Sequence, residues 1–485
     1  MIELSLTDLL EITGGKATAT AASDTVITSV TTDSREVVPG ALFVAKPGEF
    51  SDGHAFIDRA RAAGAVLALA ERITHDEDRR EHPAIIIEDA VEAMGKIAAH
   101  IVALLKEKND AKVVGITGSA GKTTTKDLLA GILSQVAPTV SPIGSYNGEV
   151  GVPLTVFSAT EETKYFVIEM GATGIGHLTY LTDMVHPQVG VVLCVGTAHA
   201  GEFGGVENIE KAKGELVEAL PADGTAILNA EDPRVARMDL RSGGAVRFFG
   251  TGKNKPENAG VWATDVVVNS HGQPELTLEF PGGYSKRITS GLLGRHHVSN
   301  ILAAANAALA LDIAPEVIAA GLEGRAAGSR WRMERIERAD GVSIINDAYN
   351  ANPESMRAAL VTLAELGLGA DGAPGRRTWA VLGEMLELGD DSIHQHDLLG
   401  RMAVRMNIKK LVVVGRGAKP AYNSAVLEGS WGDEAFYVED VDEARALLQE
   451  QLQPGDIALF KSSNGAGLRF LGDDIAAFAK EGDNA

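Results

Sequence analysis

Residues 115–129, "GITGSAGKTTTKDLL", constrain the fold of this chain more than any other segment. The β-rich run "VVGIT" leads into a glycine loop, and the loop leads into the helix-forming segment "TTTKDLLAGILSQV". In such a unit the glycines let backbone N–H groups turn toward phosphate oxygens, the lysine neutralises charge, and the threonine hydroxyl reaches Mg²⁺. We therefore predict nucleotide phosphate binding by Thr117, Gly118, Ser119, Ala120, Gly121, Lys122 and Thr123.

The loop is shorter than the common phosphate-binding pattern. That pattern has a glycine five positions before the Gly-Lys pair, and here the position is Ile116. A chance Gly-Lys-Thr in a turn is the alternative, and the strand before it and the helix after it argue against chance. The loop by itself indicates a nucleotide phosphate and leaves the reaction open.

Length and charge limit the classes of protein. At 485 residues, and with roughly one domain per 150 residues, we expect about three domains. The net charge of −22 repels polyanions, so we expect no nucleic-acid partner. A small anion can still bind, because a local cluster of N–H groups and lysines outweighs a distant, screened charge.

Cysteine content and the N-terminus indicate the compartment. Cys194 is the only cysteine, which excludes a disulfide framework and favours a reducing compartment. Its apolar run "VGVVLCVG" predicts a buried core thiol. The start "MIELSLTDLLEITGG" lacks a basic region followed by an apolar stretch, and no segment approaches the ~18 apolar residues of a membrane span. We expect a cytoplasmic protein without membrane insertion.

The sequence pattern predicts three α/β segments. The first hundred residues mix short β-rich runs with helical stretches, close on the helical "AVEAMGKIAAHIVALL" and are followed by a predicted linker, "KEKNDAK". The runs "VVGIT", "KYFVIEM", "VGVVLCVG" and "GTAILN" alternate with helices and predict a parallel sheet, whereas "GVWATDVVV" and "PELTLEF" predict an antiparallel annex. Beyond "GLEGRAAGSRWR", four strands, "GVSIIND", "TWAVLG", "KKLVVVG" and "DIALFK", predict a second doubly wound unit.

These patterns predict the fold class and the domain bounds. We expect an α/β protein with a small N-terminal α/β domain at 1–108, a central P-loop ATPase-like domain with a parallel sheet at 109–325, and a C-terminal Rossmann-like domain at 326–485.

Glu169 ends the apolar run "YFVIEMG". A buried acid is costly without a cation or hydrogen-bond donors. A carboxylate at the C-terminal end of a strand, one βα unit after a phosphate loop, lies where a magnesium ligand would sit in an open α/β sheet. An exposed acid at a strand end is the alternative.

His199 and Lys213 follow the next strand. Lys213 lies on a predicted helix whose apolar face runs through Ile209, Leu216 and Leu220. A lone histidine is more often a structural residue, and a helical lysine is usually solvated. Neither residue by itself predicts a site.

The stretch "IINDAYNANPESM" places polar residues between an apolar strand and a helix that begins near Pro353. Asp347, Tyr349, Asn350 and Asn352 are therefore candidates for ligand contact at the edge of a sheet. Capping of the helix by Asn352 also fits, and the two roles are compatible.

Together these stretches resemble the Mur ligases, the ATP-dependent amide-forming enzymes of peptidoglycan precursor synthesis, over nearly the whole chain. "TGSAGKTTT" is similar to the shortened loop of that family. Five further stretches occur in family order: "TTDSREVVPGALFVA", "NGEVGVPLT", "EKAKGE", "NDAYNANPESM" and "VLGEMLELG". They most resemble the branch of the family that joins D-alanyl-D-alanine to UDP-MurNAc-tripeptide, and nothing resembles the Asp-Asn-Pro-Arg motif of the branch that adds a diamino acid. The resemblance thus implies these two substrates.

The resemblance also implies ATP, Mg²⁺ and a set of metal ligands. Lys122 matches the phosphate contact, and Thr123, Glu169 and His199 match magnesium ligands. Lys213 matches the lysine that is carbamylated in the family and becomes an anion able to ligate a second magnesium. Lys122, Lys213, His199 and Glu169 are therefore the expected catalytic residues.

Other positions match nucleotide and substrate contacts of the family. Asn300 matches an adenine-contacting asparagine, and Arg332 and Asp347 match ATP contacts from the third domain. The residues that match contacts to the UDP sugar or other substrate groups are Thr32, Ser34, Arg35, Asn147 and Asn350.

The chain departs from the family pattern at three places. Where the family has an asparagine-rich run, this chain has Ser145-Tyr146-Asn147-Gly148. Where the family has an acidic pair, this chain has Asn346-Asp347. A late Lys-Gly-Ser is here Lys461-Ser462-Ser463, which leaves the role of the lysine open.

Two other functions remain open at this stage. Another amide-forming ligase of the superfamily, at a different Mur step or of the folate polyglutamate type, would share the ATPase core. A nucleotide switch would use the loop without ligation. The folate class lacks the first 110 residues, and a switch does not need the domain that carries "NDAYNAN". We expect a monomer.

Overall fold

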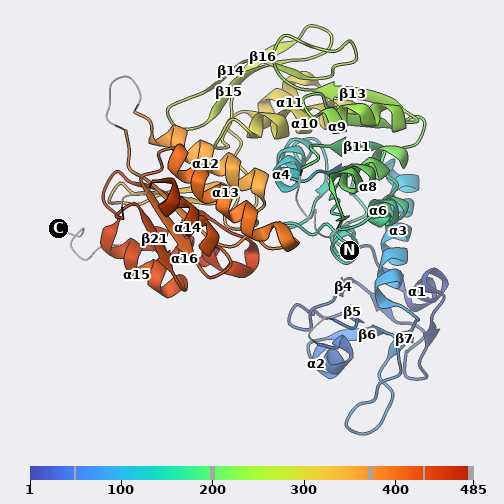
Figure 1. Cartoon of the computed structure of the whole chain (residues 1–485). Coiled ribbons are helices and arrows are strands. Elements are labelled where there is room, and N and C mark those ends of the chain that lie inside the picture. The colour runs from blue at the N-terminus through green and yellow to red at the C-terminus, as the bar shows by residue number, and fades with distance from the viewer. Residues whose placement is uncertain (49–50, 197–202, 370–374, 430–431, 479–485) are drawn as a thin grey trace.

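The structure is a computed structural model that describes residues 1–48, 51–196, 203–369, 375–429 and 432–478. Figure 1 shows three bodies that follow one another along the chain, blue at the N-terminus, green in the centre and orange to red at the C-terminus. Each body contains a β-sheet with helices against it. The predicted α/β fold with a central parallel sheet is confirmed.

The N-terminal body holds a five-stranded sheet in the order β2-β7-β6-β5-β4 and a two-stranded ribbon of β1 and β3. Every residue of β5 is buried, as its apolar sequence "ALFVA" predicts. The elements are β1 (Leu4–Ser5), α1 (Leu6–Thr13), β2 (Lys16–Ala17), β3 (Val26–Ile27), β4 (Ser29–Thr31), β5 (Ala41–Ala45), α2 (Ile57–Ala62), β6 (Ala65–Ala70) and β7 (Ala84–Ile86).

Helix α3 (Ala90–Asn109) leads into the central body. It runs through the first part of the segment predicted as a linker, and that prediction is wrong. Lys106 and Lys108 of the segment occupy the last helical turn, where positive charge is favourable. Asp110 ends the helix in the left-handed region with φ 53°, and β8 begins two residues later. One apolar cluster runs from α1 through α3 to the central sheet, so a shared core joins the two bodies.

The central body is built on a six-stranded sheet in the order β13-β12-β11-β8-β10-β9, parallel throughout. Its strands are β8 (Lys112–Thr117), β9 (Thr139–Val140), β10 (Tyr165–Glu169), β11 (Val189–Val192), β12 (Thr225–Asn229) and β13 (Ala245–Phe249). Its helices are α4 (Lys122–Leu133), α5 (Gly151–Val156), α6 (His177–Val185), α8 (Val206–Glu218), α9 (Pro233–Ala236), α10 (His297–Ala310) and α11 (Pro315–Leu322). The expected antiparallel annex is β14 (Trp262–Val268), β15 (Pro274–Glu279) and β16 (Ser285–Thr289).

The C-terminal body has a six-stranded sheet in the order β17-β18-β22-β19-β20-β21, in which only β17 is antiparallel. The four predicted strands are β18 (Ser343–Asn346), β19 (Thr378–Leu382), β20 (Lys410–Val414) and β22 (Ile457–Lys461). The edge strands β17 (Glu334–Glu337) and β21 (Ala435–Val438) were not predicted; β17 is mostly charged and half-exposed, and β21 is a run of only four residues, most of them half-exposed. The helices are α12 (Pro353–Gly367), α13 (Ser392–Arg405), α14 (Lys419–Glu428), α15 (Val441–Gln451) and α16 (Leu468–Ala477).

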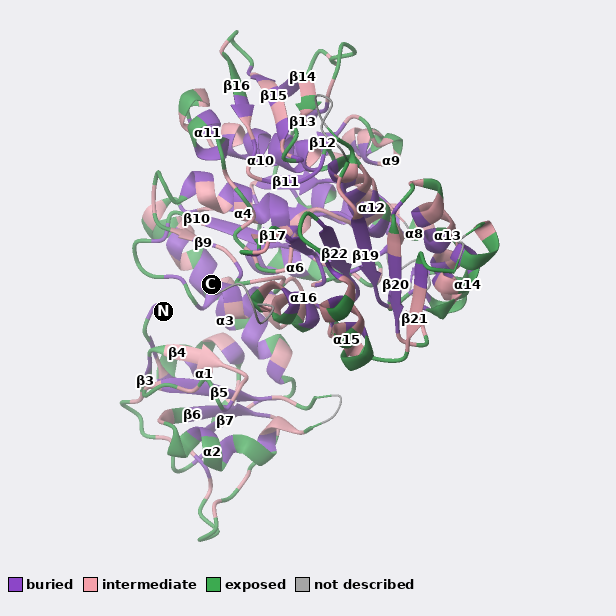
Figure 2. Ribbon diagram, turned by 90° about the vertical axis from the view of Figure 1, so that its left-hand side faces the viewer, coloured by how far each residue is buried: buried purple, intermediate pink, exposed green. Residues whose placement is uncertain are grey.

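Burial follows this layering. Figure 2 shows inner strands such as β19 and β22 in the purple of buried residues, with much of the green on outer helix faces and loops. No helix of the described ranges is long and apolar enough to cross a membrane.

Candidate active site

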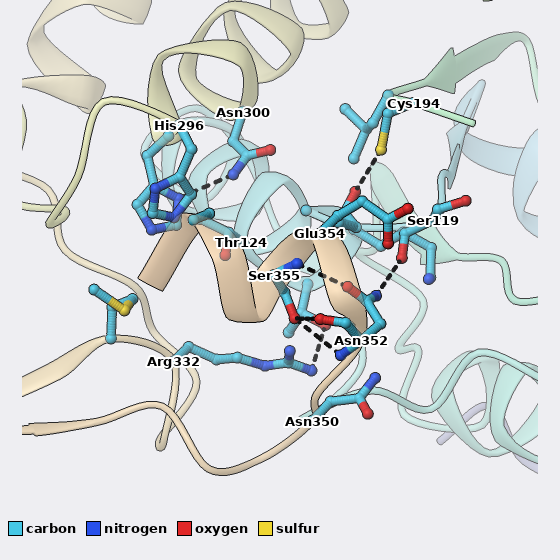
Figure 3. A pocket seen from close by; sticks show the side chains of 18 of the residues that line it. Ser119, Thr124, Cys194, His296, Asn300, Arg332, Asn350, Asn352, Glu354 and Ser355 are labelled. Carbon is cyan, nitrogen blue, oxygen red and sulfur yellow. Dashed lines mark hydrogen bonds between the residues drawn. The ribbon is translucent and has the colours of Figure 1, made fainter. Parts of the chain in front are cut away.

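A cavity of about 360 Å³ lies between the central and C-terminal bodies. Its walls include the loop between β8 and α4, the carboxyl end of β10, the start of α10 and the segment between β18 and α12. Figure 3 shows Ser119 and Asn300 of the central body and Arg332 and Asn352 of the C-terminal body around this space. The predicted nucleotide residues from the two halves of the chain therefore meet in one site.

The backbone of the phosphate loop favours glycine at positions 118 and 121. Gly118 has φ 155° and Gly121 has φ 85°, and a Cβ atom on Gly121 would lie 2.3 Å from Oδ1 of Asn300. Lys122 begins α4, and its Nζ donates a hydrogen bond to the carbonyl of Gly118 over 3.0 Å. Because a helix N-terminus presents backbone N–H groups and positive dipole charge, this geometry suits an anion. Thr117 ties the loop to β10 through a 2.9 Å bond to Met170 O.

Glu169 lies beside this helix start. Its side chain is 1% exposed and accepts hydrogen bonds from Thr123 Oγ1 over 2.9 Å and from Asn147 Nδ2 over 2.8 Å. The register explains the contact, because Glu169 pairs with Ile116 at the carboxyl edge of the sheet. The alternative of an exposed acid is wrong.

Oxygen donors gather at this point. Ser145 Oγ lies 2.6 Å from Thr123 Oγ1 and 3.5 Å from Oε2 of Glu169. Hydroxyl and carboxylate oxygens are the donors that Mg²⁺ takes in proteins, so these groups fit such an ion. In the described ranges no three or more His, Cys, Asp or Glu side chains are placed to hold a metal. His199, the other expected ligand, lies outside the described residues.

Lys213 is on α8 and is only 4% exposed, unlike most helical lysines, which are solvated. Burial, and to a lesser extent the charge of Lys122, lowers the pKa of the Lys213 amine to about 7. A large fraction of this amine is therefore neutral near pH 7.

The C-terminal body reaches the oxygen cluster through Arg332. Its guanidinium donates to Thr123 Oγ1 over 3.2 Å and to Ser145 Oγ over 3.1 Å. The same group lies 4.5 Å from the centroid of the Tyr349 ring, a cation–π distance. Arg332 thus links the two bodies at the phosphate loop.

Asp347 is held by a buried ion pair. Lys461 Nζ lies 2.6 Å from Oδ2 of Asp347 and donates to Asn350 O over 3.0 Å, while Met333 N donates to Oδ1 of Asp347 over 3.1 Å. Burial lowers the pKa of Lys461, and the neighbouring carboxylate of Asp347 opposes this shift. The lysine whose role the sequence left open therefore orients the segment 347–350.

Asn352 caps α12, one of the two roles considered for it, and it also lines the cavity. Its Oδ1 accepts from Ser355 N over 2.8 Å and caps α12, and its Nδ2 donates to the carbonyl of Ser119 over 3.2 Å. The start of α12 is thereby tied to the phosphate loop.

Asn300 and Cys194 border the same cavity. Asn300 Nδ2 lies 3.0 Å from His297 Nδ1, and Thr125 donates to Asn300 Oδ1 over 3.4 Å. The Cys194 thiol is half-buried at the cavity wall, 3.7 Å from Ala120 O, rather than enclosed in a core as predicted. Burial raises its pKa.

Thr32, Ser34 and Arg35 are not among the residues that line this cavity. They follow β4 in the N-terminal body, where Ser34 is buried and the exposed Arg35 pairs with Asp33. The expected contacts to the nucleotide sugar therefore lie in a different body from the phosphate loop.

Ser145, His296 and His297 line the cavity but were not predicted as site residues. Ser145 was noted only as a departure from a pattern. The one available signal for the histidines was their position just before Asn300 in "GRHHVSN".

A phosphate loop at the edge of a parallel sheet, facing polar residues of a second α/β domain, defines a nucleotide-dependent enzyme with a shared interdomain site. Three family descriptions match the chain in order: "Mur ligase family, catalytic domain" at residues 26–101, "Mur ligase middle domain" at 116–308, and "Mur ligase, glutamate ligase domain" at 331–464. The chain belongs to the Mur ligase family.

Curated relatives match over most of their length. The UDP-N-acetylmuramoyl-tripeptide–D-alanyl-D-alanine ligase of Mycobacterium tuberculosis is 40% identical over 98% of both chains. The ligase of the same name from Escherichia coli is 36% identical over 86% of this chain and 87% of its own.

Solved structures agree with the assignment to the Mur ligase family. A crystal structure of MurF from Acinetobacter baumannii superposes with a TM-score of 0.84 at 32% identity and covers 98% of this chain and 99% of its own. MurF ligase from Thermotoga maritima in complex with ADP has a TM-score of 0.75 at 26% identity, covering 92% and 97%.

Proposed function

We propose that this protein is an ATP-dependent ligase that adds D-alanyl-D-alanine to UDP-MurNAc-tripeptide through an acyl phosphate. The products are the pentapeptide precursor of peptidoglycan, ADP and phosphate. The observation that carries the proposal is the single cavity in which the shortened phosphate loop meets Asp347 and Asn350 of the "NDAYNAN" segment. The names and the near-complete coverage of the relatives support this choice of substrates.

We assign the phosphate end of the site to the central domain. Lys122 and the start of α4 bind the ATP phosphates, and Thr123, Glu169 and His199 hold Mg²⁺. When bound, the ion supplies positive charge that stabilises negative charge on the phosphate oxygens. Asn300, Arg332 and Asp347 contact the nucleotide, and Asn147 and Asn350 contact the other substrates.

The reaction then has two steps. An oxygen of the tripeptide's terminal carboxylate attacks the γ-phosphorus of ATP, the bond to ADP breaks, and an acyl phosphate forms. The amine of D-alanyl-D-alanine attacks the acyl carbon, loses a proton, and phosphate leaves. Lys122 stabilises charge on the transferring oxygens. Contacts such as Arg332 with Ser145 and Asn352 with Ser119 keep the two domains together and exclude water from the acyl phosphate.

Lys213 is proposed to be carbamylated. The neutral amine adds CO₂ and loses a proton, which converts it into a carbamate anion able to ligate a second Mg²⁺. The burial of Lys213 and its lowered pKa support this proposal, because both favour the neutral amine.

The remaining assignments complete the proposal. Residues 1–108 bind the UDP sugar through Thr32, Ser34 and Arg35, residues 109–325 bind ATP, and residues 326–485 form the Rossmann-like third domain. The protein acts as a cytoplasmic monomer.

Replacing Thr32 and Ser34 together with alanine is expected to raise KM for the UDP substrate by about tenfold, since two hydrogen-bonding hydroxyls are lost. KM for ATP should stay unchanged, because neither residue lines the nucleotide cavity. Steady-state kinetics with each substrate varied in turn measure both values. Ser23→Ala, an exposed serine of the same domain, is the control. A higher KM for ATP with an unchanged KM for the UDP substrate would refute the domain assignment.

The folate polyglutamate type of ligase and a nucleotide switch are the competing functions. The N-terminal body with its own five-stranded sheet argues against the former, since that class lacks such a segment. A nucleotide switch would hydrolyse ATP without an acceptor amine, whereas the proposed ligase should consume ATP only when the dipeptide is present.

Mass spectrometry of the product tests the function directly. Incubation with ATP, Mg²⁺, UDP-MurNAc-tripeptide and D-Ala-D-Ala should yield the UDP-MurNAc-pentapeptide, with one ADP per product. Omission of the dipeptide should leave the UDP substrate unextended. Extension by a different amino acid, with none by the dipeptide, would contradict the proposed substrate.

A further inference from the structure

A buried ion pair on α4 has no role in the mechanism above. Lys126 and Asp127 lie one turn after the phosphate-binding start of this helix, with Nζ of Lys126 2.5 Å from Oδ1 of Asp127. Their side chains are only 2% and 8% exposed. Removing two charges from water is costly, so a buried pair of this kind adds little stability, and stability alone does not explain it.

The pair contacts the segment that leads from the central body into the C-terminal body. Ser329 N donates to Oδ2 of Asp127 over 2.8 Å, and Lys126 Nζ donates to Ser329 Oγ over 3.4 Å. Lys126 also donates to the carbonyl of Pro142, in the loop between β9 and α5, over 2.9 Å. We call residues 329–333, which lie between α11 and β17, the strap. The phosphate-binding helix and the strap are therefore joined at one ion pair.

The backbone of the strap is strained on both sides of Arg332. Trp331 has φ 59° and Met333 has φ 52°, in the left-handed region that bulky side chains rarely adopt. Such conformations are unfavourable and persist only where the surrounding contacts fix them. The bond from Met333 N to Asp347 fixes the strap after Arg332, and the bond to Asp127 fixes it before Arg332.

Arg332 depends on the strap for its place in the nucleotide cavity. Its guanidinium extends to the hydroxyls of Thr123 and Ser145, over 3.2 and 3.1 Å (Figure 3). Arg332 and Met333 line this cavity and also a second cavity of about 660 Å³. Because the strap lies between two open spaces, the contacts at its ends decide where Arg332 points.

We propose that Asp127 is a positioning residue for Arg332. Its carboxylate holds Ser329 N and thereby keeps the strained strap in the conformation that brings the Arg332 guanidinium to the phosphate loop. Lys126 in turn holds the carboxylate of Asp127. This inference rests on the proposed use of ATP, and it adds two residues that do not line the nucleotide cavity.

The test measures binding of adenylyl imidodiphosphate, a non-hydrolysable ATP analogue, with Mg²⁺ to the full chain by calorimetry. We expect Asp127→Ala to bind it about five- to tenfold more weakly than the wild type, since the Arg332 contact is lost. Arg332→Ala should show at least the same loss. The double variant should bind no more weakly than Arg332→Ala, because Asp127 acts through Arg332. Asp127→Asn keeps an oxygen that can accept from Ser329 N, so it should bind more tightly than Asp127→Ala.

Asp340→Ala is the matched control. Asp340 forms a buried ion pair with Arg338 and accepts from Val342 N over 3.3 Å, and neither member of the pair lines the nucleotide cavity. This variant should lower the unfolding temperature as Asp127→Ala does and keep the wild-type affinity. If Asp127→Ala does not fold, the variant with Lys126→Met and Asp127→Leu takes its place. Apolar residues of similar volume can replace a buried pair without loss of stability, and this variant also lacks the acceptor for Ser329 N.

Three results would overturn the inference. The first is wild-type affinity of Asp127→Ala. The second is a double variant that shows both losses in full, since Asp127 would then act independently of Arg332. The third is an equal loss of affinity in Asp340→Ala, since lowered stability alone would then weaken binding. A wild-type protein that does not bind the analogue would instead overturn the proposed use of ATP, and the identity of the ligation product affects none of these measurements.

Discussion

Lys122→Ala is expected to lower kcat by at least about 100-fold, the cost of removing one preorganised charge from a site where negative charge develops. The Lys122 ammonium lies at the start of α4 and within 3.0 Å of the loop carbonyl of Gly118, so it is held in place before ATP arrives. With alanine at position 122, the N-terminus of α4 is the positive group that remains at the phosphates. Turnover at saturating substrates, measured by ADP release, gives the value.

Lys112→Ala is the matched control for this variant. Lys112 is the first residue of β8, the strand whose other end leads into the phosphate loop. Its exposed ammonium pairs with Asp110. An exposed pair of this kind contributes little, so kcat should stay close to that of the wild type. If Lys122→Ala kept activity within about tenfold of wild type, a change of ~1.4 kcal/mol in the barrier, its assignment to the phosphates would be wrong.

The second large effect is expected at Lys213. Lys213→Ala should be inactive, because the carbamate and its metal-binding oxygens are lost. Part of the activity should return when a short-chain carboxylic acid such as acetate or propionate is added, since its carboxylate can occupy the vacated space. Lys213→Arg should not be rescued to the same extent, because the guanidinium fills that space with a permanent positive charge. Turnover with increasing carboxylate measures the rescue.

Lys211→Ala provides the control, since Lys211 lies on the same helix two residues earlier with an exposed side chain. It should retain normal turnover and show no response to carboxylates. Nuclear magnetic resonance of wild-type enzyme equilibrated with isotope-labelled bicarbonate should show a carbamate signal that Lys213→Ala lacks. Near-normal turnover of Lys213→Ala without added carboxylate would rule out the carbamate.

Features with a local cause could be predicted from the sequence. The order of strand, glycine loop and helix at residues 112–133 follows from neighbouring residues, because glycine permits the positive φ angles of the turn and an apolar run predicts the buried strand. The parallel sheets follow in the same way from alternating strands and helices. The edge strands β17 and β21 were not found by that signal, because β17 is mostly charged and β21 is an apolar run of only four residues.

The sequence by itself determined the phosphate loop, the three α/β segments and the family, because each depends on patterns within short contiguous segments of the chain. Only the tertiary structure decided the partners of individual side chains, such as Lys461 with Asp347, Arg332 with Ser145 and Asn300 with His297. In two of these pairs the residues lie more than a hundred positions apart, and no local pattern specifies which distant strand ends will meet. The tertiary structure also decides burial. The sequence of an amphipathic helix predicts a solvated lysine, whereas the packing of α8 encloses Lys213 and lowers its pKa.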